Sequence, residues 1–404
     1  METSDFKKQY KSKNLMVLFF IIFLLLISVS YFLIITNETL GIILSISILI
    51  VMTMLLKWNA DIRFVFFGIS IFVIMKLYGF FNINPITGPD SEKYFGQVEQ
   101  FNSFSAFIKY AIEDIQQYGI MDVSSYTFFG LFYMPYYFIL NLSLPQSIAL
   151  FNSLAIISII LFWNKTNIYY FKDNLTKSQM NIFLSLLVLF LFISPSMSYW
   201  SSAFLKDILS LFLGVLAFFS FSKKKYIITI FLLILAIALR PYAIVFIGCF
   251  WIISTQRYKL AFWLSIVASI FVVYIAGFTG LVNSFPTMLR ILTIPNPFSL
   301  SNWENLFFPT AEGLIIFIGL SLAFLNFISN PQTRKFYYSF VLCLFIYSCT
   351  LTLVGHTALL SRDLEYGLLS AGDDMFRKKL PFMLVIYTMI AYTISTFKIR
   401  LRLK

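Results

Sequence analysis

The chain is poor in charged residues, histidine and cysteine. Only 12% of its 404 residues are Asp, Glu, Lys or Arg, about half the share found in a soluble domain. It has one histidine, His356, and three cysteines that all lie inside apolar stretches. Because these few residues lack metal-ligand spacing, we expect neither a His- or Cys-based metal site nor a disulfide framework.

Several motifs of nucleotide binding and catalysis are missing as well. The sequence has no Gly-x-x-x-x-Gly-Lys-Ser/Thr phosphate loop, which excludes ATP-driven transport by this chain alone. It has no Gly-x-Ser-x-Gly motif, and a single histidine leaves little room for a Ser-His-Asp triad. We expect no resident metal or cofactor, although Mg²⁺ or Mn²⁺ held only by carboxylates stays open.

What the chain has in quantity is apolar and aromatic residues. Its hydrophobic share is 59%, its mean hydropathy is +0.85, and it holds 49 Phe and 23 Tyr. A helix that crosses a bilayer needs about 20 apolar residues. The sequence therefore predicts an all-α polytopic membrane protein with one integral membrane domain over 1–404 and about twelve spans, at 15–36, 40–56, 64–82, 146–163, 179–195, 203–221, 226–239, 241–254, 260–281, 310–327, 337–354 and 380–396.

Two stretches depart from simple spans. Residues 126–142 are apolar, but they are short, rich in tyrosine and interrupted by Pro135. Counting them as a span would move the basic cluster at Lys165 to the opposite side, so we interpret them as a re-entrant or interfacial helix. The runs 226–239 and 241–254 are short helices that meet at a break at Arg240-Pro241.

Basic residues orient this predicted bundle. Cytoplasmic loops of membrane proteins collect Lys and Arg, and most acidic residues of this chain lie in the complementary segments. The net charge of +12 is therefore an inner-face feature, and no nucleic-acid partner is expected. The sequence predicts the bacterial inner membrane with both termini cytoplasmic, from the clusters Lys7/Lys8/Lys11/Lys13, Lys57/Arg63, Lys165/Lys172/Lys177, Lys223/Lys224/Lys225, Arg257/Lys259, Arg334/Lys335 and Lys398/Arg400/Arg402/Lys404.

Three outer segments are too long to be turns: 83–125, 282–309 and 355–379. Within the first, residues 98–118 have apolar positions at helical spacing and predict an amphipathic helix lying on the membrane. The second holds four prolines and is expected to be more loop than helix. The third carries the histidine and a dense run of charges. Function is therefore expected on the outer face.

The first candidate site follows the third run. Asp90 and Glu92 stand there beside Tyr94, after Gly-Pro. A carboxylate at this place could act as general base on an acceptor hydroxyl. The alternative is structural, because Asp90 is also a suitable residue for the N-terminus of a helix with acids in its first turn. We predict Asp90 as catalytic and Glu92 and Tyr94 as cleft residues.

Two more candidates are ionisable residues next to apolar runs, where charge is costly and usually functional. Lys206 and Asp207 open a helix and are predicted to shape the cleft; a simple ion pair or a snorkelling lysine is the alternative. Arg240 at the Pro241 break is placed to bind phosphate bidentately. Its alternative role is to bond the carbonyls that the break leaves free.

Cations outside the inner face depart from the usual charge distribution of membrane proteins. Binding of a pyrophosphate head group would account for them. We predict Arg290, Arg362, Arg377 and Lys378 as pyrophosphate ligands together with Arg240. The alternative for the Arg377-Lys378-Lys379 triplet is an interfacial anchor paired with neighbouring aspartates. His356 is predicted as a second catalytic base, with a structural histidine as the alternative.

In their order, these features resemble membrane glycosyltransferases of the GT-C type and the Wzy-like O-antigen polymerases that share their architecture. The residues concerned are the acidic motif Asp90–Tyr94, the Pro-x-x-x-x-Trp-Ser-x-x-x-x-Lys-Asp stretch from Pro195 to Asp207, Arg240-Pro241, and the segment from Arg362 to Leu380-Pro381-Phe382. The resemblance implies a GT-C-like fold, an undecaprenyl-linked sugar donor and arginines that hold the pyrophosphate. The acidic motif is not Asp-x-Asp, and we expect no large C-terminal outer domain.

The resulting hypothesis is a polymerase of O-antigen or capsule, which transfers glycan from undecaprenyl pyrophosphate to a lipid-linked repeat unit at the periplasmic face. Its expected partners are the undecaprenyl-linked oligosaccharide, the lipid bilayer and a chain-length regulator protein. One alternative is a GT-C glycosyltransferase that adds a single sugar from undecaprenyl phosphate-sugar. A flippase of lipid-linked sugars is another, although the inner halves of the spans carry few charges and no internal repeat is visible.

Overall fold

The structure is a computed structural model, and it describes residues 53, 56–82, 84–86, 89–119, 125–140, 145–361, 363, 366–368 and 375–397. Within these ranges the chain is helical and contains no strand. The all-α prediction is therefore confirmed for the part of the chain that the structure describes.

Five helical segments are long and apolar enough to cross a membrane, which indicates a membrane protein. Four lie in α3 (Ile62–Asn82), α7 (Pro145–Phe171), α13 (Tyr258–Thr293) and α15 (Phe307–Ser329), and the fifth, Pro331–Leu360, joins a short 3-10 helix to α16 (Arg334–Leu360). Shorter apolar helices accompany them: α8 (Lys177–Phe192), α10 (Asp207–Ser222), α11 (Tyr226–Leu239), α12 (Ala243–Ser254) and α18 (Leu380–Thr396).

Each predicted run from 64–82 onward coincides with a helix, but α7, α13 and α16 end well beyond the predicted 163, 281 and 354, at Phe171, Thr293 and Leu360. The run 15–36, and 40–56 except for Thr53 and Leu56, lie outside the described residues. The break at Arg240-Pro241 is confirmed, because α11 ends at Leu239 and α12 begins at Ala243.

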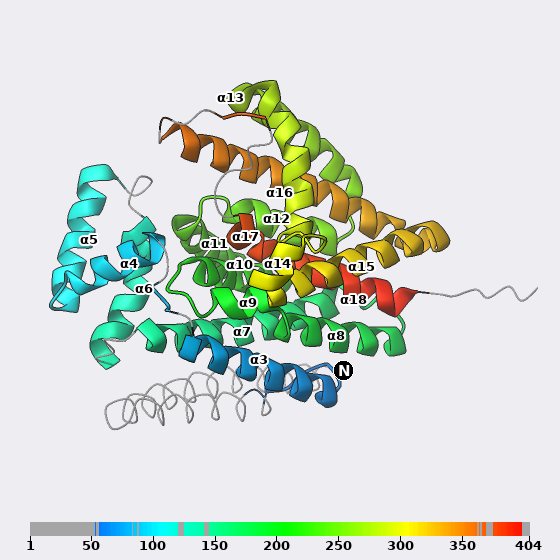
Figure 1. The fold of residues 1–404 in the computed structure, drawn as a ribbon, viewed down its shortest axis with the longest axis horizontal. Helices are drawn as coiled ribbons and strands as arrows, with labels where there is room; N and C mark the ends of the chain where they lie inside the picture. Colours follow the sequence, from blue (N-terminus) through cyan, green and yellow to red (C-terminus); the bar gives the residue numbers. More distant parts are fainter. Residues whose placement is uncertain are drawn as a thin grey trace, which may run out of the picture.

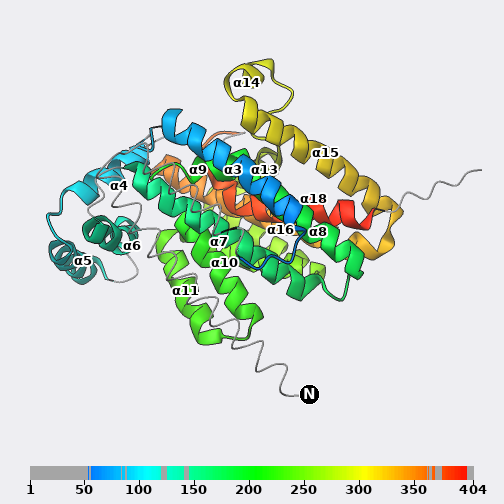
Figure 2. The ribbon, with the colours of Figure 1, turned by 90° about the horizontal axis from the view of Figure 1, so that it is seen from below.

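Helix α18 forms the centre of the bundle. Of its residues only Ile394 is exposed, and it packs between α8 and α15 (Figures 1 and 2). Peripheral helices show the opposite pattern: Ile227 of α11 and Tyr274 of α13 are 86% and 87% exposed. Exposed apolar side chains on these peripheral helices are suited to contact with lipid.

The prediction that 282–309 is mostly loop is wrong. Helix α13 continues to Thr293 through Pro286, and α14 (Leu300–Asn305) follows after a short connection. Gly277 takes a φ of 66° inside α13 and kinks it, which a glycine permits without a side-chain clash. Beyond the kink, residues at helical spacing such as Gly280, Ser284 and Ile291 are buried, and this packing compensates for the hydrogen bond that Pro286 cannot make.

Other boundaries also shift. The predicted helix 98–118 is two helices, α4 (Pro89–Glu99) and α5 (Phe104–Tyr118). The separation has a local cause, because Ser103 caps α5 by accepting a hydrogen bond from the Ala106 amide at 3.2 Å. The outer segment 355–379 begins later than expected, since α16 runs to Leu360. The described part of the predicted stretch 126–142 is helical and belongs to α6 (Ser125–Leu140), which packs with α4 and α5 at one side of the bundle (Figure 1).

Polar loops gather at two opposite ends of the bundle. Helix α18 separates them: Lys379 precedes its first residue and Thr396 is its last, and 17 residues at 1.5 Å per residue span about 25 Å. Two residues before Lys379, Arg377 lies 3.6 Å from Asp207, while Thr396 lines a cavity with Thr176 and Gln256 at the other end. Loops that the distribution of Lys and Arg predicts on one side of the membrane therefore also lie at one end of the bundle.

Candidate functional site

A charged cluster lies where α4, α10, α11 and the short helix α17 (Met375–Lys378) meet. We call Asp90, Lys206, Asp207, Arg240 and Arg377 the Asp207 cluster. Arg240 contacts Oδ2 of Asp207 at 2.7 Å, and Nε of Arg377 lies 3.6 Å from the same oxygen. Arg377 also binds Asp90 at 2.7 Å. Four segments that are far apart in the sequence are thus joined by their charges.

Local backbone structure explains how each group reaches this place. Helix α9 (Pro195–Trp200) and the following turn end at Lys206, and Asp207 is the first residue of α10, where the helix dipole favours a negative charge. Arg240 is extended, with φ −143° and ψ 107°, because Pro241 cannot continue α11. Asp90 stands in the first turn of α4.

Lys206 lies between aromatic rings in the segment before α10. Its Nζ is 5.7 Å from the ring centre of Tyr94 and 5.8 Å from that of Tyr126, and it donates a hydrogen bond to the Ser125 hydroxyl. Burial and the nearby Arg240 guanidinium lower the pKa of Lys206 to about 7. Burial likewise raises the pKa of Tyr94 and of Tyr126, so both hydroxyls stay protonated and the two rings beside Lys206 are uncharged.

The Asp207 cluster contains more cationic than anionic side chains. Lys206, Arg240 and Arg377 face two carboxylates, and the Arg240 and Arg377 side chains are only 14% and 10% exposed. Nε of Arg240 is buried and makes no hydrogen bond to any described residue. Because unbalanced buried charge is costly, this arrangement is suited to an anion that brings the missing negative charge and hydrogen-bond acceptors.

Not every predicted site residue joins this cluster. Glu92 is exposed, and Arg290 near the end of α13 makes no ion pair with a described residue. The Lys378 side chain is buried, and its carbonyl accepts a hydrogen bond from Tyr347 at 2.6 Å. His356 contacts the Tyr366 ring at 4.9 Å and has no described contact with the cluster. Arg362 lies outside the described residues.

A second buried polar centre, which the sequence analysis did not single out, surrounds Glu312. The Ser194 and Tyr387 hydroxyls donate to its Oε1 at 2.5 and 2.8 Å, and Ser196 donates to Oε2. Lys379 lies 3.6 Å from Oε2 and donates to the Ile294 carbonyl at 2.7 Å. An acid inside an apolar run is the sequence signal that could have identified Glu312.

Lys76 is a third buried ionisable group, 2% exposed within α3. Its ammonium donates to the Ser198 carbonyl and to the Ser201 and Ser202 hydroxyls at 3.3, 2.9 and 2.7 Å. All its donors are therefore used, and it fixes α3 against α9. Within the described ranges no group of His, Cys, Asp or Glu has the arrangement of a metal site.

Compared with protein-family models, with curated proteins and with solved structures, the chain matches none of them.

Proposed function

We propose that this protein is a membrane glycosyltransferase that polymerises a bacterial surface polysaccharide, O-antigen or capsule. In this proposal it has about twelve spans in a GT-C-like arrangement in the inner membrane, with both termini in the cytoplasm and the Asp207 cluster at the periplasmic face. The donor is a glycan on undecaprenyl pyrophosphate and the acceptor is a lipid-linked repeat unit. A chain-length regulator is the expected protein partner.

One observation carries the proposal: two largely buried arginines and Lys206, which is partly protonated near pH 7, meet two carboxylates at the end of a bundle of apolar helices. A lipid pyrophosphate has its charge next to its hydrocarbon chain, so its binding site needs cations at the edge of an apolar bundle. Arg240 and Arg377 supply planar guanidinium groups, which bind phosphate oxygens bidentately. Preorganised charge of this kind stabilises a leaving pyrophosphate more than any other single factor.

In the reaction, the acceptor hydroxyl oxygen attacks the anomeric carbon of the donor sugar. The bond between that carbon and the pyrophosphate oxygen breaks, and its electron pair leaves with undecaprenyl pyrophosphate. The acceptor proton passes to a carboxylate. Asp90 is the candidate base, because its side chain is 40% exposed whereas Asp207 is 6% exposed and holds two arginines.

The remaining predicted residues keep smaller parts in this proposal. Tyr94 and Lys206, which contact each other, are proposed to line the acceptor site beside Asp90, and Asp207 holds the two arginines in place. His356 stays a predicted second base, and Arg290, Arg362, Lys378 and Glu92 stay predicted binding or cleft residues.

Complementation of a strain that lacks this gene tests the proposal. Arg240→Ala and Arg377→Ala are expressed at matched level, and the surface glycan is resolved by length. We expect both variants to collapse the ladder to single repeat units, because the leaving group loses its cations. Arg63→Ala is the matched control: Arg63 also binds an aspartate at 2.7 Å, but its side chain is 84% exposed and the pair stands at the start of α3.

Each other result points to a different function. A normal ladder in both arginine variants would remove the Asp207 cluster from the reaction. A gene deletion that removes only one side sugar, with chain length intact, would replace polymerisation by single-sugar transfer. A deletion that leaves complete repeat units on the cytoplasmic leaflet would indicate a flippase.

A further inference from the structure

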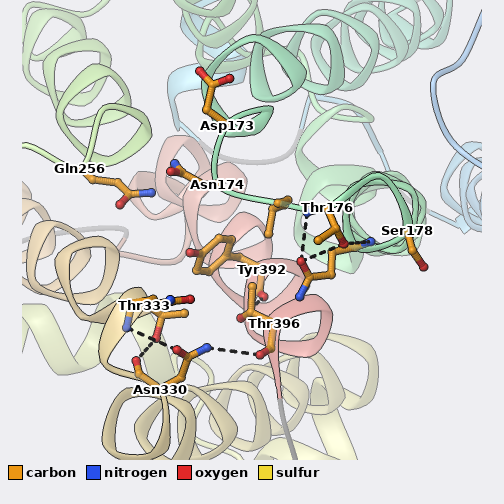
Figure 3. A pocket seen from close by; sticks show the side chains of 12 residues that line it. Asp173, Asn174, Thr176, Ser178, Gln256, Asn330, Thr333, Tyr392 and Thr396 are labelled. Carbon is orange, nitrogen blue, oxygen red and sulfur yellow. Dashed lines mark hydrogen bonds between the residues drawn. The ribbon is translucent and has the colours of Figure 1, made fainter.

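A cavity of about 700 Å³ opens at the Thr396 end of α18, opposite the Asp207 cluster. Figure 3 shows the side chains that line it. Its walls come from the turn between α7 and α8, the start of α8, the turn between α12 and α13, the connection from α15 to α16 and the end of α18. All lining residues except Asp173, Leu175 and Tyr392 are Asn, Gln, Ser or Thr. The cavity is therefore lined almost entirely by uncharged hydrogen-bonding groups.

Gln256 supplies a hydrogen-bond donor that the protein leaves unused. Its Nε2 is buried and has no hydrogen-bond partner among the described residues. Figure 3 shows its side chain directed into the cavity, toward Asn174 and Tyr392. Buried side-chain donors without an acceptor are rare in native proteins, so an acceptor on a bound molecule would complete this site.

The backbone conformation of Gln256 is one in which a glutamine side chain is unusual. The residue has a φ of 55° at the end of α12, where Arg257 donates to the Ile252 carbonyl at 3.1 Å. Such helix ends usually carry glycine. Lys224 ends α10 in the same way, with a φ of 59°, but it does not line the cavity. Because a side chain at positive φ is strained, glutamine in place of glycine at position 256 lowers stability and does not improve the helix end.

An aromatic ring forms the floor of the cavity. Tyr392 is 3% exposed and packs against Phe336 with ring centres 4.4 Å apart; no described residue forms a hydrogen bond with its hydroxyl. Amide and hydroxyl side chains both donate and accept hydrogen bonds, as sugar hydroxyls do. An anionic ligand would meet the carboxylate of Asp173 and no cation in the lining.

We propose that this cavity binds an uncharged polyhydroxylated ligand, a sugar ring that is either free or the head group of a glycolipid. The Gln256 amide donates to a ligand hydroxyl, and the Tyr392 ring lies under the sugar. The cavity volume lies within the usual range for small-molecule sites. This inference stands apart from the glycosyltransferase proposal, since it involves neither the Asp207 cluster nor catalysis.

Ligand-observed NMR on the full-length protein, purified in a detergent without a sugar head group, tests the inference with maltose as probe. Gln256→Gly removes the amide and relieves the backbone strain. We expect it to weaken maltose binding at least about tenfold, as the loss of a buried hydrogen bond does, and to raise the melting temperature. Lys224→Gly is the matched control, which should raise the melting temperature equally and leave maltose binding unchanged.

A dodecyl maltoside titration separates the two sources of the ligand. Saturable binding of maltose would assign a free sugar, and binding of dodecyl maltoside alone, lost in Gln256→Gly, would assign a glycolipid head group. If neither compound binds saturably, or if Gln256→Gly binds as the wild type does, the proposed site is wrong.

Discussion

Lys206 brings an amine into the interior, and no carboxylate of the described residues is in hydrogen-bond contact with it. It donates to Ser125, and Tyr94 and Tyr126 flank it. Its charge is therefore favoured less in the folded protein than in water, which is the reason for the fall of its pKa from 10.5 to about 7. Asp90, Asp207, Arg240 and Arg377 also act on it through space.

This pKa predicts how stability depends on pH. Below about pH 7 both the folded and the unfolded chain hold the Lys206 proton, and the folded protein bears the full cost of a buried charge. Between 7 and 10.5 the folded state loses the proton first, so stability rises with pH, by on the order of a few kcal/mol in total. We expect Lys206→Met to be the more stable protein at pH 7 and to lose this rise.

Thermal unfolding in detergent from pH 6 to 10 measures the effect. Lys93→Met, at an exposed position of α4, is the control and should follow the wild-type profile. Parallel profiles for Lys206→Met and the wild type would show that Lys206 is not buried as a strained cation.

At the scale of elements, the Glu312 centre joins α9, α15 and α18. Its carboxylate and Lys379 are both fully buried, so each charge depends on the other. Glu312→Gln leaves the Lys379 ammonium without a counter-charge, and we expect a loss of about 3–5 kcal/mol in unfolding free energy. The double variant Glu312→Gln with Lys379→Met removes both charges and should recover most of the loss.

Denaturation of both variants in the same detergent tests this dependence. Glu304→Gln, an exposed position on α14, serves as the control. A double variant as unstable as the single variant would mean that the hydroxyl network, and not the ion pair, holds these elements together.

The same elements show what the sequence could and could not predict. Asp207, Arg240 and Arg377 were identifiable because each is an ionisable residue at an end of an apolar run, and helices of similar length bring such ends together. Pairing of Glu312 with Lys379 was not predictable. All residues of α18 except Ile394 are buried. The helix therefore has no exposed polar face from which the sequence could show how it is rotated toward α15.

Helix α13 shows a second limit. The four prolines of the segment 282–309 favour a loop, but burial of residues such as Ser284 and Thr287 against α16 keeps the part of this segment that lies in α13 helical. Tertiary packing decides such cases, and a single sequence does not contain the shape of the neighbouring helix. His356 lies in the part of α16 that extends beyond the predicted run, where it contacts the Tyr366 ring and has no described contact with the Asp207 cluster.

At the scale of the whole molecule, the two polar ends of the bundle are suited to ligands of different charge. The Asp207 cluster is suited to an anionic lipid head group, and the cavity with Gln256 is suited to an uncharged ligand. Basic residues such as Lys177, Arg257 and Arg334 lie near the cavity end, and the positive-inside tendency predicts that this end faces the cytoplasm.

Cysteine labelling in intact cells tests this orientation. Glu92→Cys is exposed at the cluster end and Ser178→Cys at the mouth of the cavity, while the native cysteines are all buried and give little background. We expect a membrane-impermeant maleimide to label Glu92→Cys from outside and Ser178→Cys only after permeabilisation. The reverse pattern would place the Asp207 cluster in the cytoplasm, where periplasmic polymerisation cannot occur. Labelling of both from outside would contradict the separation of the two ends by α18.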